Sequence, residues 1–308
     1  MKPEISVVVP VLNEESVLPE FFERVEAVLS ATVKAWELVF VDDGSTDSSL
    51  DLIAQFAQGH KSVKYISLSR NFGQQVALSA GIDYATGKAL VLMDADLQDP
   101  PELIPRLYKK MLQGYEVVYA QRKARQGESL PKKATAWLFY RVFSRFTSTV
   151  IPPDTGDFRI IDEKVADVLR SMPEQQKFLR AQIAWAGYRQ GSVAYVREAR
   201  KSGKTGYSTG KMLALALDGL TSYTSIPVRF VTFSGFTVSA IAFALILYTW
   251  YVKVFTEDYV PGWASLMVTV TFLGGVQLVS VGIIGEYISR IYTNSKKRPL
   301  YVIKRSNF

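Results

Sequence analysis

Two long uncharged segments near the end of the chain most constrain how it can fold. Between Arg229 and Lys253 lie 23 residues without a charge, and a second uncharged run, 259–285, has 27. Each run is long enough to cross about 30 Å of hydrocarbon as a helix, whereas buried core helices are rarely so long and charge-free. The sequence therefore predicts two membrane-spanning helices, at about 229–252 and 261–287, rather than a pair of core helices.

The charges around these segments predict their orientation. The short link between them holds one Lys and two acids. Basic residues lie on the other side, at Arg229, Arg290, Lys296, Lys297, Arg298, Lys304 and Arg305. By the positive-inside rule, we expect both termini in the cytoplasm, in a multi-pass protein of the plasma (inner) membrane. The N-terminal sequence MKPEISVVVPVLNEE has too short an apolar run for a signal peptide, so the large N-terminal part should stay cytoplasmic.

Net charge and composition limit the classes of molecule that the protein is expected to bind. A formal net charge of +7 and a pI near 9.3 suit nucleic acid or anionic lipid, and with two spans lipid is the simpler partner, so no nucleic-acid role is expected. The absence of Cys excludes disulfides and thiolate metal sites. A basic, aromatic segment at 132–150 predicts an interfacial amphipathic helix, although a helix packed on the domain core is an open alternative.

Glycines in the second span leave the oligomeric state open. They are Gly274, Gly275, Gly282 and Gly285. Small residues allow helices to approach closely. Either a homo-oligomer or tight packing within the hairpin would use them.

The first 226 residues alternate between two hydrophobic periods. Short β-branched runs predict strands at 5–10, 37–42, 63–69, 88–94 and 116–121. Helical patterns lie between them at 15–30, 48–57, 73–84 and 101–113. This alternation predicts an α/β fold with a mostly parallel sheet. The expected organisation is a domain at 1–210, a juxtamembrane amphipathic helix at 211–226, two spans within 227–292 and a basic tail at 293–308.

Polar side chains follow several of the predicted strands. Asn13 and Glu14 come after the first strand, Asp42 ends the second, and Asp94 and Asp96 end the fourth. Open α/β sheets bind ligands outside the carboxyl ends of their strands. We therefore expect these residues to share one ligand-binding edge.

The Asp-Ala-Asp sequence at 94–96 predicts a cation site. Residues two apart in an extended segment point to the same side, so these carboxylates repel each other unless a cation lies between them. Mg²⁺ and Mn²⁺ take oxygen ligands and bridge carboxylates to substrate phosphates. A solvated loop is the alternative. The turn after the first strand, PVLNEE, has no glycine and two acids, which disfavours a nicotinamide-binding fold.

Five motifs carry a family resemblance. VVVPVLNEE, VDDGSTD and MDADLQDPPE, in that order, resemble the family 2 glycosyltransferases of GT-A fold, which is Rossmann-like. DTGDFR and REARKSGKTGYS, followed by two C-terminal spans, resemble the polyprenyl-phosphate glycosyltransferase branch, which includes dolichyl-phosphate mannose synthases and bacterial undecaprenyl-phosphate glucosyltransferases. The resemblance covers nearly the whole chain.

The resemblance implies roles for individual residues. Asp157, Asp96 and Arg159 would be catalytic, and the metal, Mg²⁺ or Mn²⁺, would be held by Asp94, Asp96 and Gln98. The nucleotide sugar would be bound by Pro10, Val11, Asn13, Glu14, Asp42, Asp94 and Arg122, with Asp42 reading the base. Arg200 and Lys204 would bind phosphate or acceptor. Many relatives have Ser-Lys-Tyr where this chain has Thr205-Gly206-Tyr207, which leaves the phosphate ligands open.

The implied reaction is a metal-dependent, inverting transfer of a hexose to a polyprenyl phosphate at the cytoplasmic membrane face. UDP-glucose and undecaprenyl phosphate are the expected substrates. UDP-N-acetylglucosamine, UDP-galactose or GDP-mannose as donor, and a lipid-sugar transport component, are the alternatives. The family resemblance does not decide whether Asp157 acts as a base or positions other groups.

Overall fold

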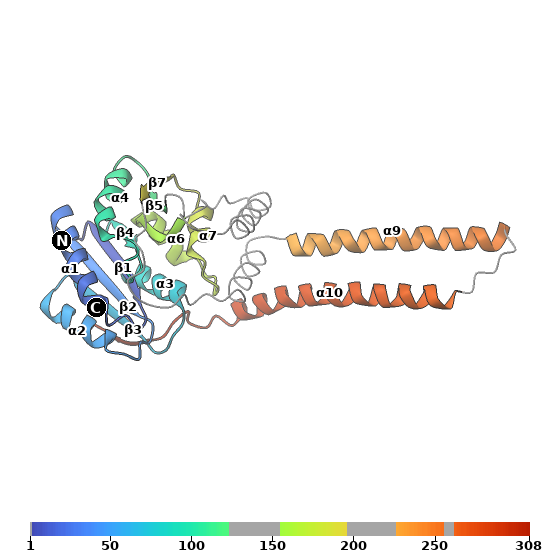
Figure 1. Ribbon diagram of the computed structural model, residues 1–308, viewed down its shortest axis with the longest axis horizontal. Helices are drawn as coiled ribbons and strands as arrows, with labels where there is room; N and C mark the ends of the chain where they lie inside the picture. Colours follow the sequence, from blue (N-terminus) through green and yellow to red (C-terminus); the bar gives the residue numbers. More distant parts are fainter. Residues whose placement is uncertain (1, 123–154, 196–225, 256–261) are drawn as a thin grey trace. The chain divides into compact units, whose positions relative to one another are not determined.

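The computed structural model divides the chain into two compact units. One comprises Met1–Gly206 with Arg298–Phe308, and the other Tyr207–Lys297. The structure describes residues 2–122, 155–195, 226–255 and 262–308 (Figure 1). The predicted helix at 132–150, most of that at 211–226, and the candidate ligands Arg200 and Lys204 lie outside the described residues.

The first unit is built, in its described part, on one eight-stranded sheet with the order β7-β5-β6-β4-β1-β2-β3-β8. The strands are β1 (Ile5–Val11), β2 (Trp36–Asp42), β3 (Val63–Leu68), β4 (Ala89–Leu92), β5 (Val117–Arg122), β6 (Thr155–Asp162), β7 (Gln190–Tyr195) and β8 (Ile303–Ser306). Strand β1 pairs in parallel with β2 and β4, as β2 does with β3 and β5 with β7. Strand β6 is antiparallel to β4 and β5, and β8 to β3. The predicted α/β fold with a mostly parallel sheet is confirmed.

Helices cover both faces of this sheet. They are α1 (Leu18–Thr32), α2 (Ser49–Gly59), α3 (Gln74–Tyr84), the 3₁₀ turn η1 (Pro101–Leu103), α4 (Ile104–Met111), α6 (Glu163–Ser171) and α7 (Leu179–Trp185). Helices α1, α2 and α4 contribute to one apolar cluster, and α3, α6 and α7 to a second. Successive β1 residues alternate between them: Val7 and Val9 join the first cluster and Val8 the second. The result is a three-layer α/β/α arrangement.

Strand register brings the predicted site residues to one edge. Val11, the last residue of β1, lies level with Asp42, the last of β2. In the antiparallel pair of β4 and β6, Leu92 lies level with Arg159. Continuing that register by two residues places Asp94 beside Asp157. Strand β6 therefore begins at the edge where the parallel strands end and runs away from it.

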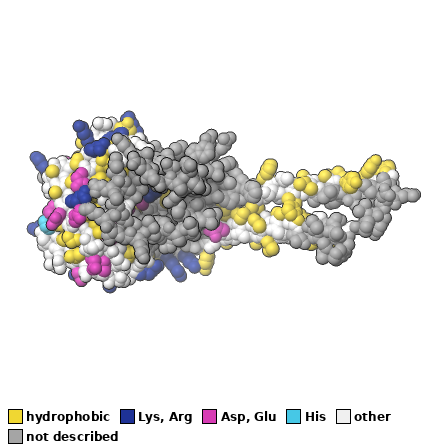
Figure 2. Space-filling view, viewed as in Figure 1, with side chains coloured by type: hydrophobic (Ala, Val, Ile, Leu, Met, Phe, Trp, Pro, Cys, Tyr) yellow, Lys and Arg dark blue, Asp and Glu magenta, His cyan; other side chains and the backbone are white. Residues whose placement is uncertain are grey.

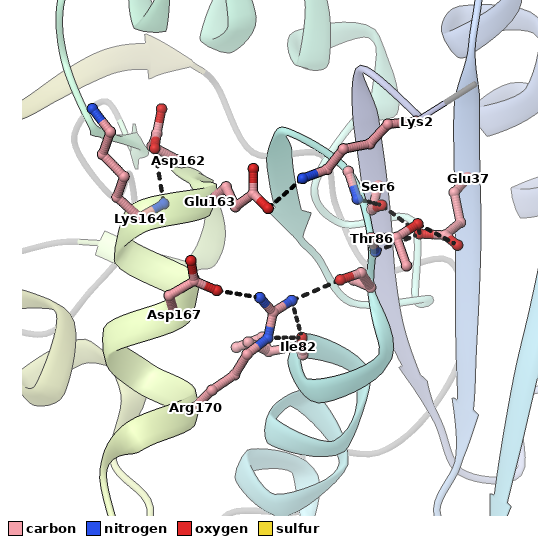
Figure 3. Close-up of polar contacts among 12 residues, drawn as sticks. Lys2, Ser6, Glu37, Ile82, Thr86, Asp162, Glu163, Lys164, Asp167 and Arg170 are labelled. Carbon is pink, nitrogen blue, oxygen red and sulfur yellow. Dashed lines mark hydrogen bonds and ion pairs between the residues drawn. The ribbon is translucent and has the colours of Figure 1, made fainter.

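The opposite edge is closed by a polar network (Figure 3). The Glu37 side chain, on a residue only 6% exposed, accepts hydrogen bonds from the Ser6 hydroxyl (2.5 Å) and from the Thr86 amide (2.9 Å). The Gly87 amide donates in turn to Ser6 Oγ (2.8 Å). A Cβ at Gly87 would lie 2.6 Å from that oxygen, so only glycine allows this approach. The network joins the start of β1 and β2 to the loop before β4.

The last residues of the chain return to the sheet, and the basic segment predicted at 293–308 includes a strand. Strand β8 pairs with β3, and the Asn307 side chain extends the pairing by accepting from the Tyr65 amide (2.7 Å) and donating to the Val63 carbonyl (3.2 Å). The Tyr301 hydroxyl donates to Asp83 at the end of α3 (2.9 Å). The sequence IKRS is short and charged, so it carries no strand pattern of its own; pairing with β3 makes it a strand.

The second unit contains two long helices, α9 (Ile226–Phe255) and α10 (Trp263–Ser295). Many of their described large apolar side chains are exposed, as Figure 2 shows along this unit. Among the described residues, Phe272–Ser295 is the one segment that is long and apolar enough to cross a membrane, with a mean hydropathy of 1.4. The predicted hairpin is thus supported for α10, whereas the span in α9 stays a prediction.

The network at Glu37 gives a stability prediction. Replacing Glu37 with Ala leaves the Ser6 hydroxyl and the Thr86 amide without their acceptor, and should lower the free energy of unfolding by about 3 kcal/mol. Urea unfolding of the detergent-solubilised protein, followed by tryptophan fluorescence, measures this. Glu23→Ala, at an exposed position of α1, is the matched control and should change it by less than about 0.5 kcal/mol. Equal losses in the two variants would contradict the assignment.

Candidate functional site

Asn13 fastens the loop after β1 to the loop after β2. Its φ of 56° lies in the left-handed region, which asparagine tolerates better than most residues. Its Oδ1 accepts from the Thr46 amide (2.8 Å), and its own amide donates to Ser45 Oγ (3.0 Å). The Glu14 amide donates to Ser49 Oγ at the start of α2 (2.9 Å). The two loops therefore form one rigid surface at the edge of the sheet.

The two acids at the end of β2, Asp42 and Asp43, are buried and accept hydrogen bonds from backbone amides of neighbouring loops. Asp42, 1% exposed, accepts from the Ser45 amide (2.9 Å) and from the Ser67 hydroxyl (2.7 Å). Asp43 accepts from the amides of Phe72 (2.7 Å) and Gly73 (2.9 Å) just before α3. Burial raises the pKa of Asp43, partly offset by these amides. Both Asp42 oxygens are thus engaged in the fold, and its predicted contact with a nucleotide base stays a prediction.

Gly44 is required where it stands. Its φ is +77°, and a Cβ there would lie 2.7 Å from the carbonyl carbon of Arg70. The loop after β2 therefore touches the loop after β3 backbone to backbone. This contact sets the position of the amides that Asp43 binds.

The Asp-Ala-Asp segment forms a tight turn after β4. Asp94 and Asp96 are half-buried, and Gln98 is 7% exposed. Asp96 Oδ1 accepts a hydrogen bond from the backbone amide of Gln98 (3.1 Å). This bond closes a turn over Leu97, whose φ is 54°. A buried leucine in the left-handed region costs energy and persists only where its surroundings enforce it. Such outliers concentrate at functional sites, which supports the prediction for this segment.

Asp157 lies at the centre of a charged cluster. Its Oδ1 accepts from Arg180 Nε (2.8 Å) and lies 3.9 Å from the Arg159 guanidinium. Its Oδ2 accepts from Gln75 Nε2 (3.3 Å). Arg159 also donates to the backbone carbonyl of Gly156 (2.7 Å). Burial opposes ionisation of Asp157, but Arg180, followed by Arg159, outweighs it and holds the pKa of that carboxyl below its ordinary value.

The pKa of Asp94 is shifted in the opposite direction from that of Asp157. Burial and the neighbouring carboxylates, Asp157 foremost, raise the pKa of Asp94 to about 7. The amide of Gln74, which donates to its Oδ1 (2.6 Å), offsets this in part. Burial lowers the pKa of Arg159 to about 10, so this side chain remains a cation at neutral pH. At this edge of the sheet, closely spaced carboxylates therefore lie next to the guanidinium groups of Arg159 and Arg180.

Three members of this cluster were not identified from the sequence. Gln74 and Gln75 open α3, and Arg180 lies in the first turn of α7. A signal existed for the glutamines, because the segment NFGQQ begins three residues after the end of β3 and so reaches the same edge of the sheet. Arg180 gave none, because its partner is distant in sequence.

The remaining predicted residues are only partly placed. Pro10 and Val11 end β1, and Arg122 ends β5, level with Tyr195 of β7. Among the described residues, no three His, Cys, Asp or Glu side chains converge as a ready-made metal cage. A cation at Asp94 and Asp96 would need further oxygen ligands from Gln98, water or a phosphate, which is how Mg²⁺ is commonly bound.

Comparison with known proteins gives a family match. The family model described as "Glycosyl transferase family 2" matches residues 6–170. A relative in Bacillus subtilis, "Uncharacterized glycosyltransferase YkcC", is 45% identical over 98% of this chain and 94% of its own length. In Escherichia coli, "Prophage bactoprenol glucosyl transferase homolog" is 38% identical over 98% of this chain and 99% of its own length.

Solved structures give a more distant likeness. Glucosyl-3-phosphoglycerate synthase from Mycobacterium tuberculosis, crystallised with Mn²⁺, UDP-glucose and phosphoglyceric acid, is 20% identical. The match covers 71% of this chain and 78% of that one, with a TM-score of 0.46.

Gly44 offers a test of the loop contact. Gly44→Ala forces an unfavourable φ and a backbone clash, so the amides held by Asp43 should loosen. Hydrogen exchange of peptides covering 70–76 should become at least about tenfold faster, as expected for a local loss of about 1.4 kcal/mol. Gly59→Ala, where a Cβ meets nothing within 4 Å, is the control and should leave those peptides unchanged. Unchanged exchange in Gly44→Ala would show that the contact is dispensable.

Proposed function

The chain belongs to glycosyl transferase family 2, and on that premise we propose that it transfers glucose from UDP-glucose to a polyprenyl phosphate at a membrane surface. The observation that carries this proposal is the extent of the match to relatives named for bactoprenol. The family model covers only residues 6–170, whereas these relatives align over 98% of the chain, both long helices included. A lipid acceptor accounts for helices that a soluble acceptor would not need.

The carboxylate turn after β4 would hold the donor. Asp94, Asp96 and Gln98 are the proposed ligands of a divalent ion, Mg²⁺ or Mn²⁺. When bound, such an ion neutralises the charge that builds on the leaving diphosphate. Crowding of like charges supports this assignment, because a cation would relieve the repulsion that raises the pKa of Asp94. The rigid surface built on Asn13 and Glu14 would receive the nucleotide.

The remaining donor and acceptor contacts are also proposals. Pro10, Val11 and Asp42 would line the nucleotide pocket, and Arg122 would contact the diphosphate. Arg200 and Lys204 would bind the acceptor phosphate. The fold places Pro10, Val11 and Asp42 at the same edge as the acids, which supports the first set.

The acceptor would be the nucleophile, and it needs no base. A phosphate monoester has a second pKa near 6, so it is largely dianionic at neutral pH. Asp157 is poorly suited to removing a proton, because Arg180 and Gln75 occupy its two oxygens and its pKa is lowered. We infer that Asp157 orients Arg180 and Arg159, whose charges would face the phosphates. Attack opposite the leaving group would invert the anomeric carbon and give a β-linked product.

Helix α10 would hold the enzyme in the plasma (inner) membrane. Its apolar segment Phe272–Ser295 is long enough to span, and the basic residues Lys296, Lys297 and Arg298 follow it directly. This pattern supports a cytoplasmic position for the residues after the helix. The second span in α9, the interfacial helices and a homo-oligomer are parts of the same proposal.

The donor and the metal can be tested together. Purified protein with undecaprenyl phosphate, Mg²⁺ or Mn²⁺, and a panel of labelled nucleotide sugars should move label into the lipid phase from UDP-glucose, and NMR should show a β linkage. EDTA should abolish transfer. Asp96→Ala should lower the rate at least about 100-fold, within the range that removal of one electrostatic group costs. Asp51→Ala, at an exposed position of α2, should stay within about twofold. Transfer from another donor, or in EDTA, would contradict the proposal.

The pH profile tests the role of Asp157. Because its pKa is lowered, Asp157 is ionised throughout the neutral range and cannot produce an ascending limb there. With Mg²⁺ or Mn²⁺ at saturation, which keeps Asp94 ionised, the rate should instead rise with pH through about 6, as the acceptor phosphate loses its second proton. Asp157→Asn should lower the rate about 10- to 1000-fold but keep that limb. If the limb disappears in Asp157→Asn, Asp157 is a general base.

A further inference from the structure

We propose that Gln75 is a positioning residue, which holds Asp157 and the start of α7 in one fixed geometry for transfer. The inference rests on the proposed function and adds to it a residue that lies outside the five family motifs. Gln75 lies in the first turn of α3, half-buried. Its side-chain amide has partners on two other elements.

The two hydrogen bonds of the Gln75 side chain complete a closed ring of contacts. Gln75 Nε2 donates to Asp157 Oδ2 (3.3 Å), and Gln75 Oε1 accepts from the backbone amide of Leu179 (3.1 Å). Leu179 begins α7, and the next residue, Arg180, donates to the other Asp157 oxygen (2.8 Å). Four residues from α3, β6 and α7 thus form a ring around one carboxylate.

The chemistry of the ring is specific for an amide side chain. An ionised carboxylate can only accept, and a backbone N–H can only donate, so the bridge between them must offer a donor and an acceptor at one end. Glutamine does this; glutamate can accept from Leu179 but cannot donate to Asp157. Leucine has neither group. Substitutions at Gln75 therefore separate the two contacts.

Helix α3, which carries the bridging residue Gln75, is itself held in place. The amides of Phe72 and Gly73, directly before α3, donate to Asp43 at the end of β2. Within the helix, Gly81 packs so closely on β1 that a Cβ there would lie 2.2 Å from Val8 Cγ1. Helix α3 therefore cannot shift without breaking contacts, and it presents Gln75 at a constant place.

The neighbouring residue extends the arrangement to the metal side. Gln74 donates to Asp94 Oδ1 (2.6 Å), so successive residues of one helical turn contact the two acids that stand side by side. Gln74 contacts Asp94, which is proposed to help hold the donor, and Gln75 contacts Asp157, which is proposed to lie beside the acceptor. Gln75 acts through Asp157 and Arg180 and needs no contact with substrate.

The test is a kinetic comparison in the full-length protein. Gln75→Leu removes both contacts and should lower kcat about 10- to 100-fold, while the KM for UDP-glucose stays within about twofold. Gln75→Glu keeps the acceptor for Leu179 but places a second carboxylate against Asp157, so its kcat should fall at least as far. Gln55→Leu, the same change at an exposed position of α2, should leave both constants unchanged. A Gln75→Glu enzyme with wild-type kcat would overturn the proposal.

A double-mutant cycle shows whether Gln75 acts through Asp157. In an Asp157→Asn background, Gln75→Leu should cost less than about twofold further, because interacting residues are not additive. Losses that simply multiply would mean that Gln75 acts elsewhere. If Asp157→Asn leaves no measurable rate, Arg180→Lys serves as the background, with the same expectation.

A measurement without turnover separates this proposal from the proposed function. Hydrogen exchange of peptides covering 155–162 and 179–185 should quicken in Gln75→Leu and not in Gln55→Leu, whichever donor the enzyme uses. If wild-type protein transfers no sugar but exchange changes as expected, the function is wrong and the bridge stands. If wild-type protein transfers glucose but neither exchange nor kcat changes in Gln75→Leu, the bridge is wrong.

Discussion

Two neighbouring carboxylates, Asp94 just after β4 and Asp157 in β6, stand level with each other at the edge of the sheet, and the surrounding structure offsets their repulsion mainly at Asp157. The antiparallel insertion of β6 beside β4 places them there. Arg180 and Arg159 stabilise the charge on Asp157, whereas Asp94 accepts a hydrogen bond from the Gln74 side-chain amide and has a raised pKa. The guanidinium groups therefore offset the charge on Asp157 more fully than the Gln74 amide offsets that on Asp94, which lies on the side of the edge where the cation is proposed to bind.

Helix α3 connects this edge to distant parts of the first unit. Its first turn contacts Asp94 and Asp157, and its last turn meets the end of the chain, where the Tyr301 hydroxyl donates to Asp83 and the rings of Tyr84 and Phe308 pack 5.0 Å apart. The helix is 11 residues long, so it spans roughly 16 Å at 1.5 Å per residue. The segment that follows α10 in sequence thus supports the same helix that orients the acids.

What the sequence could predict followed from local periodicity. The five buried strands β1 to β5 and helices α1 to α4 carry strong apolar patterns, and their order implied a shared edge with Asp42, Asp94 and Asp96. Strands β6, β7 and β8 were missed because they mix polar and apolar residues and become strands only by pairing with others. Asp157 and Arg159 were found through a family motif, whereas Gln75 and Arg180 were not. Their partners lie 82 and 23 positions away, and no local pattern encodes such contacts.

The electrostatics of the edge bear on the class of acceptor. A sugar hydroxyl must lose a proton as it attacks, and the carboxylate best placed to take that proton would have a raised pKa and a free oxygen. Asp157 has neither, because two side chains donate to it and its pKa is lowered. A phosphate acceptor arrives already ionised, and what it requires is positive charge. Arg159, with a pKa of about 10, and Arg180 lie beside Asp157 and would supply that charge in the proposed function. The geometry of this edge therefore suits a nucleophile that is an anion before it binds.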